Sequence, residues 1–218
     1  MKILLTGGSG KLGQELQKHR DYLAPSRAEL DLTKEQQIKD YLELHQPDLI
    51  VLSGGYVKSL EPESDTMEAL ECFWTNVLSV QYFVKYAMCP IIYISTEGVI
   101  DPYNIYTATK LMAENIIKKH HSYTIIRTNF WPRPFQFPKA ADDLITIGDY
   151  IDKIAFIINC IVGMVPTNQI IYAGTGAKTV ANLARETRPD IEGVPAETFG
   201  IPKRRELFYA SMCSIANA

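Results

Sequence analysis

Residues 2–13 read Lys2-Ile-Leu-Leu-Thr-Gly-Gly-Ser-Gly-Lys-Leu-Gly13, a short apolar run that passes into a glycine-rich turn. The run predicts a buried β-strand, and the apolar positions after the turn predict a helix over about residues 10–19. Glycines 7, 10 and 13 follow a G-x-x-G-x-x-G spacing, with Ser9 inside the turn. One glycine suits a tight turn, one the approach of a pyrophosphate, and one the packing of helix on strand. The stretch therefore predicts a dinucleotide-binding turn formed by Gly7, Ser9, Gly10 and Gly13, the alternative being an ordinary strand–helix connection.

Strands and helices alternate along the rest of the first 130 residues. Alternation of this kind is typical of a parallel sheet with helices on both faces. Beyond Asn129 three prolines interrupt the pattern before it resumes. Strands are predicted at 22–24 (weak), 48–53, 90–95, 123–127 and 169–173, and helices at 33–44 (with Thr33 as N-cap), 66–86, 106–119, 149–161 and 179–188.

These elements predict an α/β fold, a Rossmann-type doubly wound parallel sheet with a small C-terminal substrate cap. We expect a single domain over residues 1–218. Within it, residues 1–130 form the dinucleotide-binding core, and residues 131–218 form a small substrate-binding part interleaved with that core. The end of the chain is expected to be rich in loops.

The composition excludes several classes of partner. The 218 residues are 46% hydrophobic and 22% charged, with a formal net charge of −3. No basic field is present that would attract nucleic acid or anionic lipid. The apolar stretch 154–165 is too short to cross a bilayer, and the N-terminal run ends too soon for a signal peptide. We therefore expect a cytoplasmic protein with no nucleic-acid or membrane partner.

The cysteines predict neither a disulfide framework nor a metal site. They are widely separated and contain no C-x-x-C pair. Such a distribution indicates reduced thiols in a cytosolic protein. The four are Cys72, Cys89, Cys160 and Cys213.

The choice of dinucleotide depends on the residues after the second strand. An acid there suits the ribose of NAD, whereas an arginine suits the 2′-phosphate of NADP. Ser26 and Arg27 occupy this region and favour NADP over NAD, although Arg27 also fits a solvated loop. Asp31-Leu32 falls where an adenine would lie, although Asp31 could instead serve the N-terminus of the next helix. Ser53-Gly54-Gly55 follows the next strand, at the sheet edge where ligands bind in doubly wound folds.

A tyrosine and a lysine lie four residues apart, at Tyr106 and Lys110. On a helix they share one face, and a nearby ammonium lowers a phenol pKa, so that the tyrosine can transfer a proton at neutral pH. Lys110 could also hold a nicotinamide ribose. Ser95 and Thr96 end the preceding strand, where a hydroxyl could hold a substrate oxygen. The alternative is a packed tyrosine beside a solvated lysine, but the combination with the glycine turn favours a catalytic set.

Taken together, the motifs resemble the extended short-chain dehydrogenase/reductase superfamily, and among its members the dTDP-4-dehydrorhamnose reductases. The matches span about the first 155 residues in the expected order. They are residues 1–13, Glu29-Leu-Asp-Leu-Thr33, Gln46-Pro-Asp-Leu-Ile50, Ile94-Ser-Thr-Glu97, Tyr106-Thr-Ala-Thr-Lys-Leu-Met-Ala-Glu114, Ile126-Arg-Thr128 and Asp149-Tyr-Ile-Asp152.

The resemblance implies a role for each matching residue. Thr96 would be the hydroxyl partner, Tyr106 the acid/base, and Lys110 its activator and ribose ligand. Glu97 and Phe130 match positions near the substrate. Gly10, Lys11 and Leu12 would contact the pyrophosphate, Asp31 and Leu32 the adenine, and Ser53, Gly54 and Gly55 the cofactor ribose.

The activity implied is an NAD(P)-dependent oxidoreductase that reduces a keto group on a nucleotide-linked deoxysugar. The resemblance also implies a homodimer through the helices near 66–86 and 106–119. Only nine residues separate Thr96 from Tyr106, fewer than usual in the family, and the C-terminal part is also short. Two other functions stay open: a nucleotide-sugar epimerase or dehydratase of the same superfamily, and a non-catalytic NADP-binding regulatory subunit such as that of methionine adenosyltransferase.

Overall fold

The computed structural model describes residues 1–57, 66–164 and 168–201. Cys213 and the loop-rich end expected for the chain lie outside these residues. The described part is built on one five-stranded sheet, in the order β1-β2-β3-β4-β9, and every neighbouring pair is parallel. The strands are β1 (Ile3–Thr6), β2 (Leu49–Leu52), β3 (Ile91–Thr96), β4 (Tyr123–Thr128) and β9 (Gln169–Tyr172).

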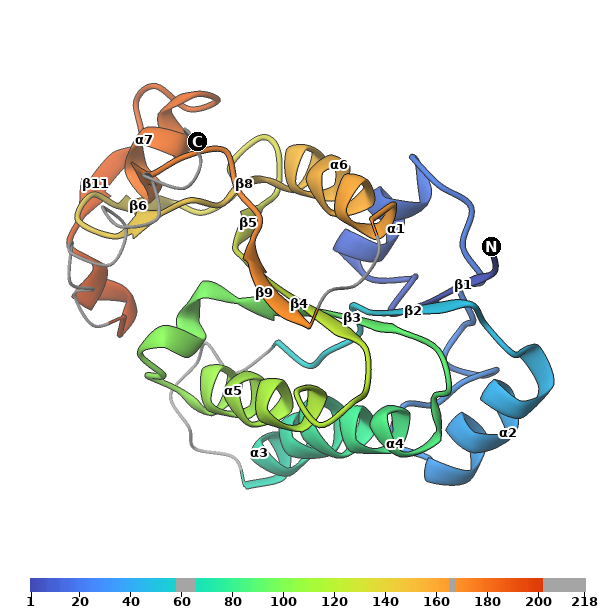
Figure 1. Ribbon diagram of the computed structural model, residues 1–218. Helices are drawn as coiled ribbons and strands as arrows, with labels where there is room; N and C mark the ends of the chain where they lie inside the picture. The colour runs from blue at the N-terminus through green and yellow to red at the C-terminus, as the bar shows by residue number, and fades with distance from the viewer. Residues whose placement is uncertain (58–65, 165–167, 202–218) are drawn as a thin grey trace.

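Helices cover both faces of this sheet, as Figure 1 shows. One face is covered by α1 (Lys11–Gln17) and α6 (Ile151–Val162). The other is covered by α2 (Glu35–His45), α4 (Ser79–Tyr86) and α5 (Ile105–Ile117). The α3 helix (Thr66–Phe73) continues through a π-helical turn η1 (Trp74–Leu78) into α4, so the predicted 66–86 helix is one element with a widened turn. The predicted doubly wound parallel fold is confirmed.

Alternation of side chains along the strands divides the interior into two cores. On β1, Ile3 and Leu5 pack under α1 and α6, whereas Leu4 packs toward α2 and α4. On β3, Ile92 and Tyr93 likewise face opposite sides. Because both faces are covered, each of these strands reads as a continuous apolar run instead of an alternating one.

Two local predictions were wrong. The strand expected at 22–24 is reduced to a single bridge, in which Leu23 pairs with Leu4 at the edge of the sheet. Pro25 lies two residues further on and has no amide N–H with which to extend the ladder. Thr33 is not an N-cap: its hydroxyl bonds to Asp31 Oδ1 at 2.8 Å, and α2 begins at Glu35 with Lys34 as its cap.

The C-terminal part has its own small core around Phe135, Tyr150, Leu183 and Ile191. It is interleaved with the sheet, because α6 and β9 return from it to the main layers. Its short elements are β5 (Phe130–Trp131), β6 (Lys139–Ala141), β7 (Ile145–Thr146), β8 (Asp149–Tyr150), β10 (Lys178–Thr179), α7 (Val180–Arg185), β11 (Glu192–Val194) and the 3₁₀ turn η3 (Ala196–Phe199). A further 3₁₀ turn, η2 (Glu97–Ile100), follows β3.

Candidate active site

The glycine turn joins β1 to α1 and has no room for side chains. Gly7 has φ of +70°, a conformation that favours glycine, and its carbonyl accepts the Gly10 amide at 2.9 Å. A Cβ at Gly13 would lie 2.2 Å from the Gly7 oxygen. The N-cap of α1 is Gly10, which has no side chain, so the first-turn amides of Lys11 and Leu12 lack the usual capping acceptor. The turn thus has the shape and the donors that a pyrophosphate requires.

The segment after β2 forms the neighbouring wall. Ser53 Oγ donates to the Thr6 carbonyl at 2.8 Å, and the Gly54 amide donates to Thr6 Oγ1 at 3.1 Å. A Cβ at Gly54 would meet Leu32 Cδ1 at 2.7 Å, and one at Gly7 would meet the Gly54 Cα at 2.6 Å. The structure therefore brings the glycine turn, Leu32 and residues 53–54 together at the carboxyl edge of the sheet.

The segment that bears on the choice of cofactor lies between the Leu23 bridge and α2. Arg27 has a side chain 84% exposed, and its Nε lies 3.9 Å from Asp31 Oδ2, a loose ion pair. Ser26 donates through Oγ to Glu29 Oε2 at 2.8 Å. Asp31 Oδ1 accepts from the amide and the hydroxyl of Thr33. Of these five polar side chains, Arg27 is thus the most available to an added ligand.

Lys110 is almost entirely buried, at 5% exposure. Its Nζ donates to the Ile94 carbonyl at 2.6 Å and lies 4.1 Å from the centre of the Tyr93 ring. Burial lowers the Lys110 pKa to about 7, against the opposing effect of Glu114 and Cys72. The lysine is therefore a packed group at the end of β3, and the alternative of a solvated lysine is excluded.

Tyr106 is half-buried in the first turn of α5. Burial raises its pKa well above the ordinary value for tyrosine, and Cys72 and Tyr103 raise it further. The expected lowering by Lys110 is not seen in this structure, because desolvation dominates and the ammonium is directed to Ile94. The phenol thus keeps its proton at neutral pH, as a proton donor must.

The hydroxyls that end β3 are held differently from each other. Thr96 Oγ1 donates to Asn129 Oδ1 at 2.9 Å and accepts the Gly98 amide at 3.2 Å, and the residue is 7% exposed. Ser95 Oγ donates to Glu114 Oε1 at 2.6 Å and is 4% exposed. Thr96 remains at the sheet edge that we predicted for it, whereas the Ser95 hydroxyl is committed to a buried carboxylate.

The two residues expected near a substrate, Glu97 and Phe130, differ in their exposure to solvent. Glu97 is fully buried, and its carboxylate accepts from Thr146 Oγ1 at 3.0 Å and from the Gly148 amide at 3.1 Å. It therefore links the end of β3 to the C-terminal part. Phe130, at the start of β5, is 36% exposed and available for contact with a ligand.

Sequence reasoning missed a buried polar cluster beside the tyrosine and lysine. Asn76, in the π-helical turn, donates to Tyr56 O at 3.0 Å, to Thr109 Oγ1 at 3.2 Å and to Cys72 Sγ at 3.2 Å. The Tyr56 amide returns a bond to Asn76 Oδ1 at 2.8 Å. A polar residue on the buried face of a long apolar helix was the available signal, since buried amides are retained where they are bonded.

Two ion-pair networks were missed as well. Arg127 donates to both oxygens of the fully buried Glu114, at 2.9 and 2.7 Å. In the C-terminal part, Lys178 and Lys153 pair with the buried Asp149, which also accepts from Thr175. Although burial opposes it, these hydrogen bonds hold the pKa of Asp149 well below its usual range.

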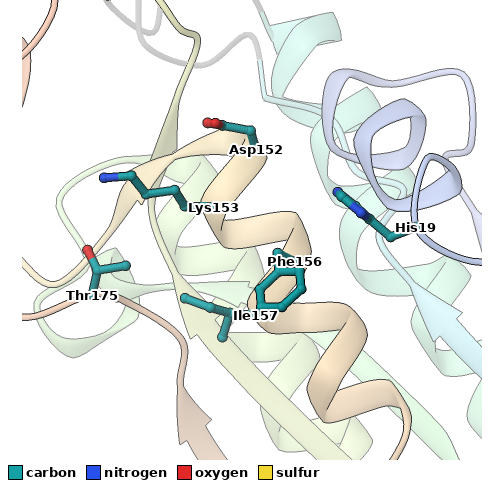
Figure 2. Close-up of a pocket in the computed structure, with 6 residues that line it drawn as sticks. All are labelled: His19, Asp152, Lys153, Phe156, Ile157 and Thr175. Atoms are coloured by element: carbon teal, nitrogen blue, oxygen red, sulfur yellow. The ribbon is translucent and has the colours of Figure 1, made fainter.

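A hollow of about 430 Å³ lies over α6 (Figure 2). None of its lining residues is among those predicted for cofactor or substrate. They are His19, Asp152, Lys153, Phe156, Ile157 and Thr175. Over the ranges described, no group of three or more His, Cys, Asp or Glu side chains could hold a metal ion, and no helix is long and apolar enough to cross a membrane.

Comparisons with known proteins identify a family for this chain. The sequence model of the RmlD substrate binding domain matches residues 1–131. A GDP-L-colitose synthase from Yersinia pseudotuberculosis is 42% identical over 62 residues, which cover 26% of this chain and only 20% of that relative.

Solved structures extend the likeness in fold to nearly the whole chain. A dTDP-4-dehydrorhamnose reductase from Bacillus anthracis, in complex with NADP, has a TM-score of 0.78 at 22% identity, covering 94% of this chain and 88% of that one. The Bordetella bronchiseptica enzyme WbmG, in complex with NAD and UDP, has a TM-score of 0.67 at 15% identity, covering 99% and 94%. Because the family model matches more than half of its length, the chain belongs to the RmlD substrate binding domain family, within the extended short-chain dehydrogenase/reductase superfamily.

Proposed function

We propose that this protein is an NAD(P)-dependent reductase of a keto group on a nucleotide-linked deoxysugar. The observation that carries the proposal is that the glycine turn, Thr96 and the Tyr106–Lys110 pair all lie at the same edge of a parallel sheet. In doubly wound folds, ligands bind at this carboxyl edge. Family membership supports the same assignment.

The residues present fit a bound dinucleotide. Gly7, Gly10 and Gly13 leave open the space that their side chains would fill, and the uncapped start of α1 offers amides to a pyrophosphate. Leu32 and Gly54 would lie beside the adenine and ribose. The exposed Arg27, with Ser26 beside it, supports NADP over NAD, since a guanidinium pairs well with a 2′-phosphate.

The chain's own residues then serve proton transfer. When bound, the nicotinamide supplies a hydride to the keto carbon. Tyr106, which burial keeps protonated, donates its proton to the keto oxygen, while the Thr96 hydroxyl, which donates to Asn129 in this structure, would turn to donate to that oxygen. Lys110 offers its remaining N–H groups to a ribose, because only one is used by Ile94.

We also propose where the substrate and a second subunit bind. The C-terminal part around Phe135 and Tyr150 is the proposed substrate cap, with Phe130 at its entrance. A cytoplasmic homodimer is proposed through α3 and α5. Exposed large apolar side chains on these helices and the adjoining π-helical turn support it, since such patches mark interfaces: Met67, Leu70, Trp74 and Met112.

The test is turnover of purified protein with NADPH and a dTDP-linked 4-keto-deoxysugar, followed by nicotinamide absorbance. We expect stoichiometric NADPH consumption, and a loss of at least about a hundredfold in kcat for Tyr106→Phe. Full activity of Tyr106→Phe would contradict the acid assignment. Conversion of a nucleotide sugar without net NADPH consumption would indicate the epimerase or dehydratase. Cofactor binding without turnover, together with a stable partner protein, would indicate the regulatory subunit.

A further inference from the structure

We propose that Tyr93 is a positioning residue for the proposed reductase, and that the face of its ring holds the Lys110 ammonium in place at the end of β3. The inference rests on the proposed function for its consequence in catalysis. The contact itself rests on geometry alone: Lys110 Nζ lies 4.1 Å from the ring centre. Cations within about 6 Å of an aromatic face are attracted by the ring quadrupole, most strongly where both groups are desolvated.

Both partners meet that condition. Tyr93 is 1% exposed and Lys110 is 5% exposed. The ammonium is held from a second direction by the Ile94 carbonyl at 2.6 Å. Because Tyr93 and Ile94 are consecutive on β3, the strand supplies the ring from one residue and the carbonyl from the next. The ammonium is thereby held at Ile94, two residues before Thr96 on β3. Its lysine lies one helical turn after Tyr106 on α5.

The Tyr93 hydroxyl does not explain why a tyrosine, and not another large apolar residue, occupies this position. It is buried and has no hydrogen-bond partner within the described part of the chain. Buried tyrosine hydroxyls normally find a partner, so this one contributes no bond that would retain it. The ring is the part of the side chain that meets a functional group, and the aromatic face is therefore the feature that we assign to Lys110.

Other groups also act on Lys110 and must stay constant in a test. Glu114, one turn later on α5, and Cys72 on α3 both favour the charged lysine, whereas burial opposes it. Glu114 is itself neutralised by Arg127 from β4. Tyr106 shares the helix with Lys110. A change confined to the electron density of the ring at position 93 leaves all of these in place.

The test replaces Tyr93 by Phe and then by difluoro- and pentafluorophenylalanine, which weaken the attraction at nearly constant ring size. The Lys110 pKa is measured by carbon-13 NMR of labelled lysine in the full chain without cofactor, with Lys110→Met identifying the resonance. We expect Tyr93→Phe to retain the wild-type pKa. The pentafluoro variant should lower the pKa by about one unit, a tenfold change in the ionisation constant.

An unchanged pKa across the fluorinated series would overturn the proposal. So would a shift already complete in Tyr93→Phe, because that would assign the effect to the hydroxyl. If the series behaves as expected, the same variants should shift the pH profile of kcat/KM in parallel. If the Lys110 pKa falls stepwise across the fluorinated variants but the protein has no reductase activity, the Tyr93–Lys110 contact is upheld and the proposed function fails. The two failures are therefore distinguishable.

Discussion

Replacing Glu114 by Gln should reveal how strongly the helix that carries Tyr106 and Lys110 is anchored to the sheet. Glu114 lies on α5, and its carboxylate accepts from Arg127 at 2.9 and 2.7 Å and from Ser95 at 2.6 Å. The glutamate side chain is 0% exposed and the arginine side chain 14%. The amide of Gln keeps the shape but removes the charge and turns an N–H donor toward the Arg127 or Ser95 donors.

Breaking a buried pair in this way costs about 3–5 kcal/mol of unfolding free energy, because the remaining charge stays buried without its partner. Arg127 retains some solvent contact and a bond to Tyr172 at 2.6 Å, so we expect about 3 kcal/mol. For a chain of this length, such a loss lowers the Tm by about 6–12 °C. Urea unfolding followed by circular dichroism measures the change directly, provided that the slope with denaturant is unaltered.

Lys139→Gln is the matched control. It breaks the Lys139–Glu192 pair, with a similar distance of 3.0 Å but with side chains 45% and 61% exposed. Exposed pairs of this kind contribute at most about 1 kcal/mol. If Glu114→Gln cost no more than Lys139→Gln, the argument that this network anchors α5 would be refuted.

Three further changes test the site. Gly13→Ala places a Cβ 2.2 Å from the Gly7 oxygen and should weaken NADPH binding at least about tenfold. The control is Gly163→Ala, whose Cβ would meet Cys160 O at 3.3 Å and which should leave NADPH binding unchanged. Equal NADPH affinities of the two variants would refute the role of the tight turn. Lys110→Met should raise stability most at pH 6 and progressively less toward pH 10, measured by urea unfolding. The folded pKa of Lys110, about 7, lies below the unfolded value near 10.4. Between these two values the folded wild type binds fewer protons than the unfolded chain, so its stability rises with pH. A stability difference between Lys110→Met and wild type that did not change with pH would contradict the burial of this lysine. Arg27→Ala should weaken NADPH binding about tenfold and leave NADH binding unchanged, and a parallel loss for both cofactors would remove the preference for NADP.

The main layers of the fold could be predicted from the sequence, because buried parallel strands and amphipathic helices leave strong patterns. The runs that became β2 and β3 are apolar without interruption, since both of their faces are covered. The strand at Leu23 failed as a prediction, because a single bridge at a sheet edge depends on its neighbour and not on a local pattern. The cap at Thr33 failed because Asp31 competes for its hydroxyl.

The sequence pointed to the candidate site only through its local motifs. The glycine turn and the Tyr106–Lys110 spacing are of this kind. The partners that fix the site come from distant segments and have no local signature: Asn76 bonds to Tyr56 and Thr109, and Glu97 to Thr146, 49 residues away. The same is true of the charge environment, in which burial raises the pKa of Tyr106 instead of the lowering expected from Lys110.

Titration of the purified protein with NADPH and with NADH, followed by nicotinamide fluorescence, tests the central claim most directly. The geometry of the glycine turn and the exposed Arg27 predict saturable binding of both cofactors, with NADPH the tighter. Failure of both to bind below millimolar concentrations would contradict the account, because the turn would then be only a structural connection.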